Sequence, residues 1–334
     1  MPASEFDLIA AINDCLPLRS ERVRIPSGDD AAVVEPHSAT AVSVDAVVDG
    51  VHFNLEQFGP RAVGRKALAA ALSDLAAMGA IPGEAYISLG APPEMEDGVL
   101  LGIADGLAEV ATRESVTIGG GDLVSSPTLF LSVTAVGYET GNAALVTRSG
   151  AKPGDLIGVT GELGGAAAAL ELLDPSGARP EISSTLREQL LARQLDPTPR
   201  LDEGHALAET GAVAMIDISD GLGADAGHVA SASGCRIEID LERVPVAEGV
   251  AEVASSDGAA LELAAGGGED YELLAAIPTE DFVRATAAVR EAGGVLTEIG
   301  YVAEGRGVAL RLPGGGEIQP SGFDQRRGSL SGSG

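Results

Sequence analysis

Apolar residues recur along the chain at intervals that predict alternating helices and strands. Over residues 60–78, Leu68, Leu72 and Leu75 are spaced by four and three, which places them on one face of a helix. A similar repeat predicts a helix over residues 95–113. Helices are also predicted near residues 5–16, 166–173, 184–195, 201–210, 258–264 and 280–292, with a further one starting near residue 222.

Short apolar runs between these helices predict strands. They cover residues 84–89, 129–136, 156–160, 213–216, 236–241, 271–277, 295–301 and 308–312. Because both halves mix strands with helices, we expect an α/β fold of the α+β type with two mixed-sheet domains. A turn-rich connection near residues 145–155 predicts the division into domains of residues 1–147 and 148–326, and the Gly/Ser-rich residues 327–334 predict a flexible tail.

Composition narrows the possible partners. The 334 residues suffice for two domains, and 45% apolar content supports a hydrophobic core. A formal charge of −29, from 21 basic and 50 acidic residues, disfavours nucleic acid and anionic membranes as partners. It does not exclude a phosphorylated substrate, because bound metal ions can reverse the local sign of the charge. The two cysteines form no zinc or disulfide pattern.

Nothing in the sequence predicts export or membrane insertion. The first residues lack a basic region followed by an apolar core, and no apolar run reaches 18 residues. We therefore expect a cytoplasmic protein.

Residues 27–53 combine acids, turns and a strand. Ser43 and Asp45 point to one side of this strand while Val42 and Val44, which suit a core, point to the other. If Asp30 and Asp45 converge, two carboxylates about 4 Å apart repel each other by roughly 4 kcal/mol at an effective dielectric near 20. Such a pair requires a bound cation or a shifted pKa.

A simpler interpretation of this stretch stays open. Asp29, Asp30 and Asp49 also suit ordinary turns, with Asp45 merely exposed.

Three other acids lie where a ligand could approach. Asp74 sits on an alanine-rich side of its helix, away from the leucines, although a solvated helix Asp is the alternative. Asp122 follows three glycines, which we expect to form a turn able to contact a phosphate, although a purely structural glycine turn is the alternative. Asp217 ends a strand just before Ser219 and Asp220, where α/β folds bind ligands; helix capping by Ser219 or Asp220 is the alternative.

Gly161, Gly164 and Gly165 form a weaker signal. Strand, glycines and helix follow one another as in a nucleotide-binding turn, but the spacing is not Gly-x-Gly-x-x-Gly and no acidic ribose partner is evident. A nicotinamide oxidoreductase is therefore a distant alternative. The chain also lacks the Gly-x-x-x-x-Gly-Lys-Ser/Thr phosphate loop.

Taken together, the motifs resemble the thiamine-monophosphate kinase family, in the superfamily that includes aminoimidazole ribonucleotide synthetase. The resemblance runs from Glu5-Phe6 to Gly322-Phe323. Its motifs are, in order, Gly28-Asp29-Asp30, Ser43-Val44-Asp45 with His52, residues 72–79 (LSDLAAMG), Gly120-Gly121-Asp122, residues 147–150 (TRSG), residues 217–221 (DISDG) and residues 267–273 (GGEDYEL).

The resemblance implies phosphorylation of thiamine monophosphate by ATP, with several Mg²⁺ ions, to give thiamine diphosphate in the last step of its biosynthesis. The positions that match the family's metal ligands are Asp30, Ser43, Val44, Asp45, Asp74, Asp122, Asp217 and Asp220. The nucleotide contacts match Gly121, Asp122, Arg148 and Ser219, and the substrate contacts match His52, Glu269 and Phe323. The resemblance further implies a homodimer joined through the N-terminal sheets, with ATP bound toward the N-terminal domain.

Two positions depart from the family pattern. Relatives often carry Thr after Ser43, whereas Val44 offers only its carbonyl oxygen. After Phe323 the family often has His-Phe, and this chain has Gln325-Arg326, so Phe323 has the weakest sequence match of the assigned positions.

The expected chemistry agrees with the residues present. A phosphate monoester has a second pKa near 6, so the acceptor oxygen is already ionised at neutral pH and needs no general base. The obstacle is repulsion between two anions, which carboxylate-bound Mg²⁺ relieves while setting in-line geometry. This chemistry uses many acids and few histidines, and the chain has 50 Asp and Glu but 4 His.

Other functions stay open at this stage. Aminoimidazole ribonucleotide synthetase is the nearest; selenophosphate synthetase needs a reactive Cys that is absent from the glycine-rich N-terminal segment, and the hydrogenase maturation dehydratase ends in a Cys where this chain ends Ser331-Gly332-Ser333-Gly334. A non-enzymatic acidic binding module belongs to another class. It would give no metal-dependent heat when titrated with Mg²⁺ and ATP.

Overall fold

The computed structural model describes residues 11–12, 14–16, 22–25, 33–34, 39–139, 141, 143–174, 181–318, 322–324 and 329–331. The chain divides into two compact units, Met1–Leu75 with Ala80–Glu139, and Ala76–Gly79 with Thr140–Gly334. Asp30 and most of the predicted helix at residues 5–16 lie outside the described residues. Within the described ranges, no helix is both long enough and apolar enough to span a membrane.

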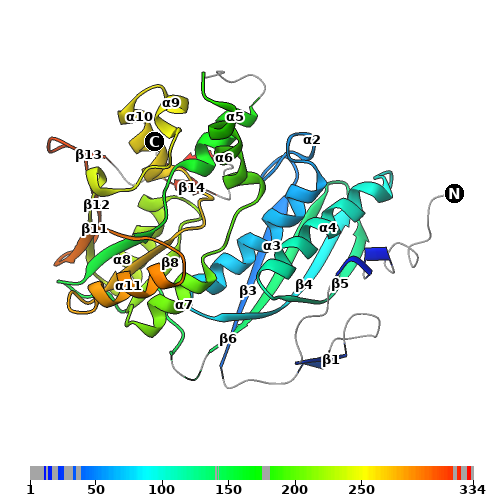
Figure 1. Ribbon diagram of the computed structural model, residues 1–334, viewed down its shortest axis with the longest axis horizontal. Helices are drawn as coiled ribbons and strands as arrows, with labels where there is room; N and C mark the ends of the chain where they lie inside the picture. The colour runs from blue at the N-terminus through cyan, green and yellow to red at the C-terminus, as the bar shows by residue number, and fades with distance from the viewer. Residues whose placement is uncertain are drawn as a thin grey trace. The chain divides into compact units, whose positions relative to one another are not determined.

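The first unit is built on a four-stranded sheet covered by two long helices (Figure 1). The sheet order is β3-β6-β4-β5, with β4 and β5 parallel and the other pairs antiparallel. Its strands are β3 (Thr40–Val48), β4 (Ile81–Ala91), β5 (Thr117–Ser125) and β6 (Phe130–Tyr138); the helices are α2 (Leu55–Phe58), α3 (Pro60–Ala77) and α4 (Asp97–Arg113); β1 (Val23–Ile25) pairs with β2 (Val33–Val34).

Helices α3 and α4 pack closely because each presents a glycine to the other. A Cβ on Gly64 would lie 2.1 Å from the Ile103 carbonyl oxygen, and one on Gly106 would lie 2.0 Å from the Arg61 carbonyl oxygen. Arg61 also forms a 2.9 Å ion pair with Asp105 beside this contact. The predicted helix of residues 60–78 is confirmed as α3. Its last residue is Ala77, and Gly79, just beyond this end, has a φ of +65°, which is typical of a glycine that terminates a helix.

Strand β3 alternates as expected, but its valines were assigned to the wrong side. Val42 and Val44 are 60% and 66% exposed, whereas Ser43 and Asp45 are half-buried. Ser43 pairs with Ala135 of β6. Ala135 is fully buried, so Ser43 lies on the face of the sheet that the helices cover. The uncovered outer face of this sheet is therefore partly apolar.

The predicted glycine turn before Asp122 is also wrong. Residues 117–125 form one continuous strand, β5, with Asp122 in its middle. A Cβ on Gly121 would lie 2.2 Å from the Ile87 carbonyl oxygen, and one on Gly119 would lie 2.9 Å from the Tyr86 ring. The glycines let β5 pack against β4 instead of making a turn.

The second unit holds a seven-stranded mixed sheet in the order β13-β12-β9-β11-β7-β10-β8. Its strands are β7 (Leu156–Thr160), β8 (Ala214–Asp217), β9 (Arg236–Asp240), β10 (Leu273–Ile277), β11 (Leu296–Ala303), β12 (Gly307–Arg311) and β13 (Glu317–Ile318). Only the β9–β12 pair is parallel among the described strands of this sheet. The α/β prediction with two mixed sheets is confirmed.

Helices cover both faces of this larger sheet. Leu222 and Val229 of α8 share one core with Ile157 and Val159 of β7, whereas Gly158 between them faces Phe282 of α11. The helices are α5 (Gly165–Leu173), α6 (Ser184–Leu195), α7 (Leu201–Glu209), α8 (Leu222–Ser233), the 3₁₀ turn η1 (Leu241–Arg243), α9 (Val250–Ala254), α10 (Asp257–Gly266) and α11 (Phe282–Glu291). Helix α9 had no sequence prediction. Near the C-terminus, β14 (Gly322–Asp324) pairs with β15 (Ser329–Ser331).

Candidate active site

In the first unit, β3 and α3 bring a serine and two carboxylates to the covered face of the sheet. Ser43 Oγ donates a short hydrogen bond to Asp74 Oδ2, although the two residues are 31 positions apart. Asp45 lies two residues further along β3, on the same face as Ser43, and its Oδ1 accepts from the Ala46 N–H at 2.7 Å. Asp74 is thus half-buried and bonded to Ser43, which contradicts the alternative of a solvated helix residue.

The turn after β3 orients His52. The Val48 N–H donates to His52 Nδ1 at 3.1 Å, so the neutral ring carries its proton on Nε2. Asp49 Oδ1 accepts from the Leu55 N–H at 3.0 Å, as the interpretation of Asp49 as a turn residue predicts. In this tautomer the hydrogen-bond donor of the His52 ring is its Nε2–H group.

Asp122 lies on the opposite face of the same sheet. It pairs with Ser88, Ser88 pairs with Ser132, and Ser132 pairs with Ala46, the neighbour of Asp45. Residues paired across strands share a face, so Asp122 and Asp45 project to opposite sides. Asp122 and Gly121 are both exposed.

In the second unit, the two motifs DISDG and GGEDYEL meet through their backbones. The Glu269 N–H donates to the Ser219 carbonyl at 2.8 Å, and the Tyr271 N–H donates to the Ile218 carbonyl at 2.9 Å. A Cβ on Gly268 would lie 2.4 Å from the Ser219 carbonyl oxygen, so only glycine allows this approach. The fold thus places Ser219, Asp220 and Glu269 in one group.

Asp225 organises this group, and the sequence analysis missed it. It is 2% exposed, and its Oδ2 accepts from the backbone N–H groups of Ser219, Asp220 and Gly221 at 3.0–3.1 Å. Gly221 is the N-cap of α8 and has no side chain, so capping of this helix by Ser219 or Asp220 is wrong. An Asp in the first turn after a glycine N-cap was the available signal.

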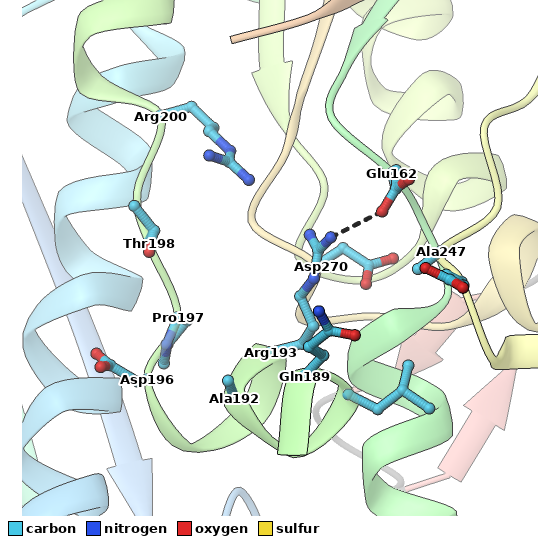
Figure 2. Close-up of a pocket in the computed structure, with 12 residues that line it drawn as sticks. Glu162, Gln189, Ala192, Arg193, Asp196, Pro197, Thr198, Arg200, Ala247 and Asp270 are labelled. Carbon is cyan, nitrogen blue, oxygen red and sulfur yellow. Dashed lines mark hydrogen bonds and ion pairs between the residues drawn. The ribbon is translucent and has the colours of Figure 1, made fainter. Parts of the chain in front are cut away.

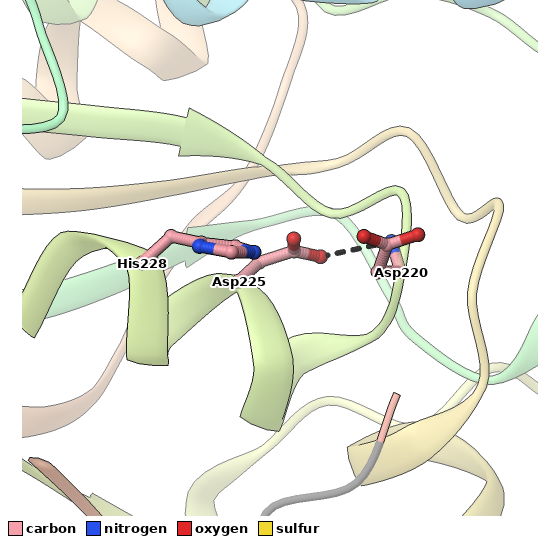
Figure 3. Close-up of side chains that lie close together, drawn as sticks. All are labelled: Asp220, Asp225 and His228. Carbon is pink, nitrogen blue, oxygen red and sulfur yellow. Dashed lines mark hydrogen bonds between the residues drawn. The ribbon is translucent and has the colours of Figure 1, made fainter. Parts of the chain in front are cut away.

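Asp220, Asp225 and His228 place one ligand atom each within 4.8 Å of one another (Figure 3). Burial raises the pKa of Asp225 to about 8, assisted by Asp217 and Asp220 and opposed by the backbone donors. Asp217 itself is 3% exposed at the end of β8. The turn therefore brings three acidic side chains close together, and their mutual repulsion favours the protonated form of Asp225.

The acids of the GGEDYEL motif have different partners. Glu272 is fully buried and receives a bidentate contact from Arg200 at 2.6 and 2.8 Å and a bond from Thr160 Oγ1 at 2.8 Å. Glu269 Oε2 instead accepts from Gln194 Nε2 at 2.7 Å. The sequence analysis missed Gln194, although it continues the stripe Leu186, Leu190 at intervals of four.

The side chain of Asp270 lies at the N-terminal end of α5. Its two carboxylate oxygens accept from the Gly164 and Ala166 N–H groups at 2.7 and 3.1 Å. Burial raises the pKa of Asp270 to about 7, while these two donors lower it. Because a carboxylate of the protein already binds these donors, the turn at residues 161–165 does not offer them to a phosphate.

A cavity of about 410 Å³ opens beside Asp270 (Figure 2). Arg193 and Arg200 contribute cations to its wall, and Glu162 and Glu248 contribute acids. Arg193 forms a 2.9 Å ion pair with Glu162 across the opening. The two arginines of the wall are thus both paired with glutamates of the protein.

Two further predicted residues lie on other segments of the second unit. Arg148 is exposed on the loop before β7, where its carbonyl accepts from Ser233 Oγ and the neighbouring Thr147 carbonyl accepts from the Met215 N–H at 3.0 Å. Phe323 belongs to β14, of which only the backbone is described.

The donor set suits Mg²⁺. Ser43, Asp45 and Asp74 present oxygen atoms on one face, and β3 is an edge strand, so half of its carbonyls point away from β6. Mg²⁺ prefers a few carboxylate oxygens together with waters and substrate phosphates. The chemistry of these residues therefore fits the implied metal.

Two family models match the chain, one for each unit: AIR synthase related protein, N-terminal domain, at residues 28–138, and AIR synthase related protein, C-terminal domain, at residues 152–313. The thiamine-monophosphate kinase of Salmonella typhimurium is 39% identical over 308 residues, covering 90% of this chain and 91% of the relative. That of Methanopyrus kandleri is 39% identical over 312 residues, covering 92% and 93%. The chain belongs to the thiamine-monophosphate kinase family.

Solved structures agree with this family. The thiamine-monophosphate kinase of Stenotrophomonas maltophilia K279a superposes with a TM-score of 0.82 at 34% identity, covering 93% of this chain and 97% of that one. AaThiL complexed with AMPPCP and TMP gives 0.75 at 35% identity, covering 95% and 96%. The hydrogenase maturation protein HypE of E. coli shares the fold at 22% identity and a TM-score of 0.70. The resemblance to thiamine-monophosphate kinases is thus confirmed.

Proposed function

We propose that this protein transfers the γ-phosphoryl group of ATP to thiamine monophosphate, forming thiamine diphosphate in the last step of its biosynthesis. The observation that carries the proposal is the 39% identity to thiamine-monophosphate kinases over about nine tenths of the chain. The similar AaThiL structure contains TMP and AMPPCP, an analogue of ATP with a methylene bridge. We place this reaction in the cytoplasm, where ATP is available.

The transfer is direct and needs no catalytic base. The acceptor phosphate, with a second pKa near 6, is already largely dianionic at neutral pH. What the protein must supply is alignment and charge neutralisation. Bound Mg²⁺ would neutralise the phosphate oxygens and hold donor and acceptor in line.

We assign roles to named residues on this basis. Several Mg²⁺ ions are held by Asp30, Ser43, the Val44 carbonyl, Asp45, Asp74, Asp122, Asp217 and Asp220. ATP is contacted by Gly121, Asp122, Arg148 and Ser219, and thiamine monophosphate by His52, Glu269 and Phe323. The Ser43–Asp74 bond supports the first set, because it holds two oxygen ligands beside Asp45.

We also propose a homodimer formed through the outer face of the four-stranded sheet, with residues 1–147 and 148–326 as the two domains of each protomer. The exposed Val42 and Val44 on that face support it. Asp122 projects from this same outer face, on the side of the sheet opposite to Asp45.

A coupled assay of ADP release tests the function. Purified protein with Mg²⁺ and ATP receives thiamine monophosphate, thiamine or no acceptor. We expect ADP release only with thiamine monophosphate, and thiamine diphosphate as the product. Equal release without an acceptor would overturn the proposal.

A labelling experiment tests the direct route. Protein incubated with γ-³²P-ATP and no acceptor is denatured and separated from free nucleotide. We expect no label on the protein. Labelled protein would indicate an aspartyl-phosphate intermediate instead.

A further inference from the structure

The backbone at Glu269 is in an unfavourable conformation for a residue with a side chain. Its φ is +67°, and Tyr271 two residues later has a φ of +52°. Residues with positive φ are usually glycine, and three glycines, at 266–268, stand immediately before Glu269. Strained non-glycine residues of this kind cluster at ligand-binding sites. The conformation therefore points to a need for the Glu269 carboxylate itself.

Gln194 holds that carboxylate from a neighbouring helix. It is 1% exposed at the end of α6, and its Nε2 donates to Glu269 Oε2 at 2.7 Å and to the Ala166 carbonyl at 3.3 Å. The two bonds use both amide hydrogens, and a flipped amide would turn its oxygen toward two acceptors. The orientation of Gln194 is thus set by its partners.

The comparison with Glu272 shows what this arrangement achieves. Glu272 lies three residues away and is bound bidentately by Arg200, which cancels its charge inside the protein. The amide of Gln194 is neutral, so its bond orients Glu269 Oε2 without itself being an ion pair. A carboxylate oriented by a neutral donor suits a ligand group that is cationic or donates hydrogen bonds. Thiamine monophosphate carries both, in its thiazolium and aminopyrimidine rings.

We propose that Gln194 is a positioning residue that orients the Glu269 carboxylate toward the thiamine part of the substrate and thereby sets the affinity for that substrate. The inference rests on the proposed function, because it takes thiamine monophosphate as the ligand of Glu269. Gln194 of α6 would thus act on substrate binding through Glu269, without contacting the phosphate groups itself.

A double-mutant cycle tests the proposal. The variants are Gln194→Met, which keeps the length of the side chain but donates no hydrogen bond, Glu269→Ala, and both together. We expect Gln194→Met to raise KM for thiamine monophosphate about tenfold while KM for ATP stays within twofold. In the Glu269→Ala background, Gln194→Met should change neither constant further. Glu188→Met is the control, because Glu188 is exposed on the same helix and does not line the cavity.

A merely structural role gives a different pattern. Loss of packing alone would lower the unfolding midpoint in urea, shift both Michaelis constants and act equally with or without Glu269. Gln194→Glu repeats the test with a different effect on packing and charge, since a carboxyl group there either repels Glu269 or shares a proton with it, and neither restores the neutral amide donor.

The outcomes separate this inference from the proposed function. An active wild-type protein whose Gln194→Met and Gln194→Glu variants keep the wild-type KM for thiamine monophosphate overturns the role of Gln194 alone. A wild-type protein that is inactive with thiamine monophosphate overturns the proposed function and this inference together.

Discussion

Asp45 is the residue whose substitution tests the proposed metal chemistry most directly. It shares the covered face of β3 with Ser43, which bonds to Asp74. We expect Asp45→Asn to keep the fold, because the side chain keeps its size, and to lower kcat by orders of magnitude. Raised Mg²⁺ should restore part of the activity, since the lost charge weakens metal affinity. The measurement is kcat over a series of Mg²⁺ concentrations.

Asp202→Asn is the matched control, because Asp202 is exposed on α7 and loses the same charge. It should keep wild-type activity at every Mg²⁺ concentration. An Asp45→Asn protein with normal activity at low Mg²⁺ would contradict the ligand role.

Asp270 should make stability depend on pH in the direction opposite to an ordinary surface carboxylate. Its pKa is raised to about 7 by burial, helped by Glu272 and opposed by Arg193 and the α5 donors. The folded state therefore holds this proton more tightly than the unfolded state. The stability that the proton contributes is fully present below about pH 4 and is lost as the pH rises toward 7.

We expect the loss from Asp270 to be on the order of 2–3 kcal/mol between pH 5 and 7.5. Asp270→Asn lacks this titration, so its free energy of unfolding should gain on that of the wild type as the pH rises. Urea unfolding of both proteins at pH 5 and 7.5 measures the difference. Parallel pH dependences in the two proteins would refute it.

At the scale of elements, the second unit depends on loops that pack backbone against backbone. The segment before β10 packs against the turn that follows β8. Gly268 lies against the Ser219 carbonyl, and Gly221 lies against the Gly266 carbonyl. Such contacts leave no room for a Cβ, so the glycines define the distance between two acidic loops. The same segment then enters β10 through Glu272, whose carbonyl accepts from the Ile218 N–H at 2.7 Å.

The Arg200–Glu272 ion pair should be a large contributor to the stability of this unit. Glu272 has no exposed surface, and Arg200 binds both of its oxygens. Arg200→Met leaves a buried carboxylate whose remaining partners among the described residues are Thr160 and the more distant Arg193, so we expect a loss of about 3–5 kcal/mol. Adding Glu272→Gln should recover part of this loss, because it removes the buried charge. Urea unfolding gives both values.

Arg284→Met is the control for that pair. Its 2.9 Å ion pair with Asp281 is largely solvent-exposed, so the change should stay within about 1 kcal/mol. An Arg200→Met protein no less stable than the control would show that Glu272 does not depend on Arg200.

At the scale of the whole molecule, the outer face of the four-stranded sheet predicts association. Val42 and Val44 are exposed side by side on an edge strand, which monomeric proteins usually avoid. We expect a dimer at micromolar concentration without any ligand, because the interface is a sheet face and not the nucleotide. Sedimentation velocity measures this, and a protein that is only monomeric would contradict it.

Val44→Glu should shift that dimer toward monomer, since it places a charge on the proposed interface. Val283→Glu is the control: Val283 is 80% exposed on α11, in the other unit. Equal dissociation by both variants would show that the sheet face is not the interface.

Local patterns in the sequence were sufficient for most elements. Residues 156–160 and 184–195 were predicted as β7 and α6 with the bounds that the structure has, because apolar periodicity reports local backbone geometry. The acidic motifs could also be recognised from the sequence, because glycine and aspartate are both favoured at turns for local conformational reasons. Their order along the chain also predicted the family, which the comparisons confirm.

Tertiary packing decided which side of each element is used. Alternation along β3 separates Ser43 from Val44 but cannot say which face the helices cover, and the valines proved to be the exposed ones. A run of glycines suits a turn or a close strand equally, and only the approach of β4 made residues 119–121 a strand. The role of Gln194 could be inferred only from its hydrogen bond to Glu269, which is 75 residues away in the sequence. These features depend on long-range contacts, because a neighbour distant in the chain determines whether a side chain is buried, paired or exposed.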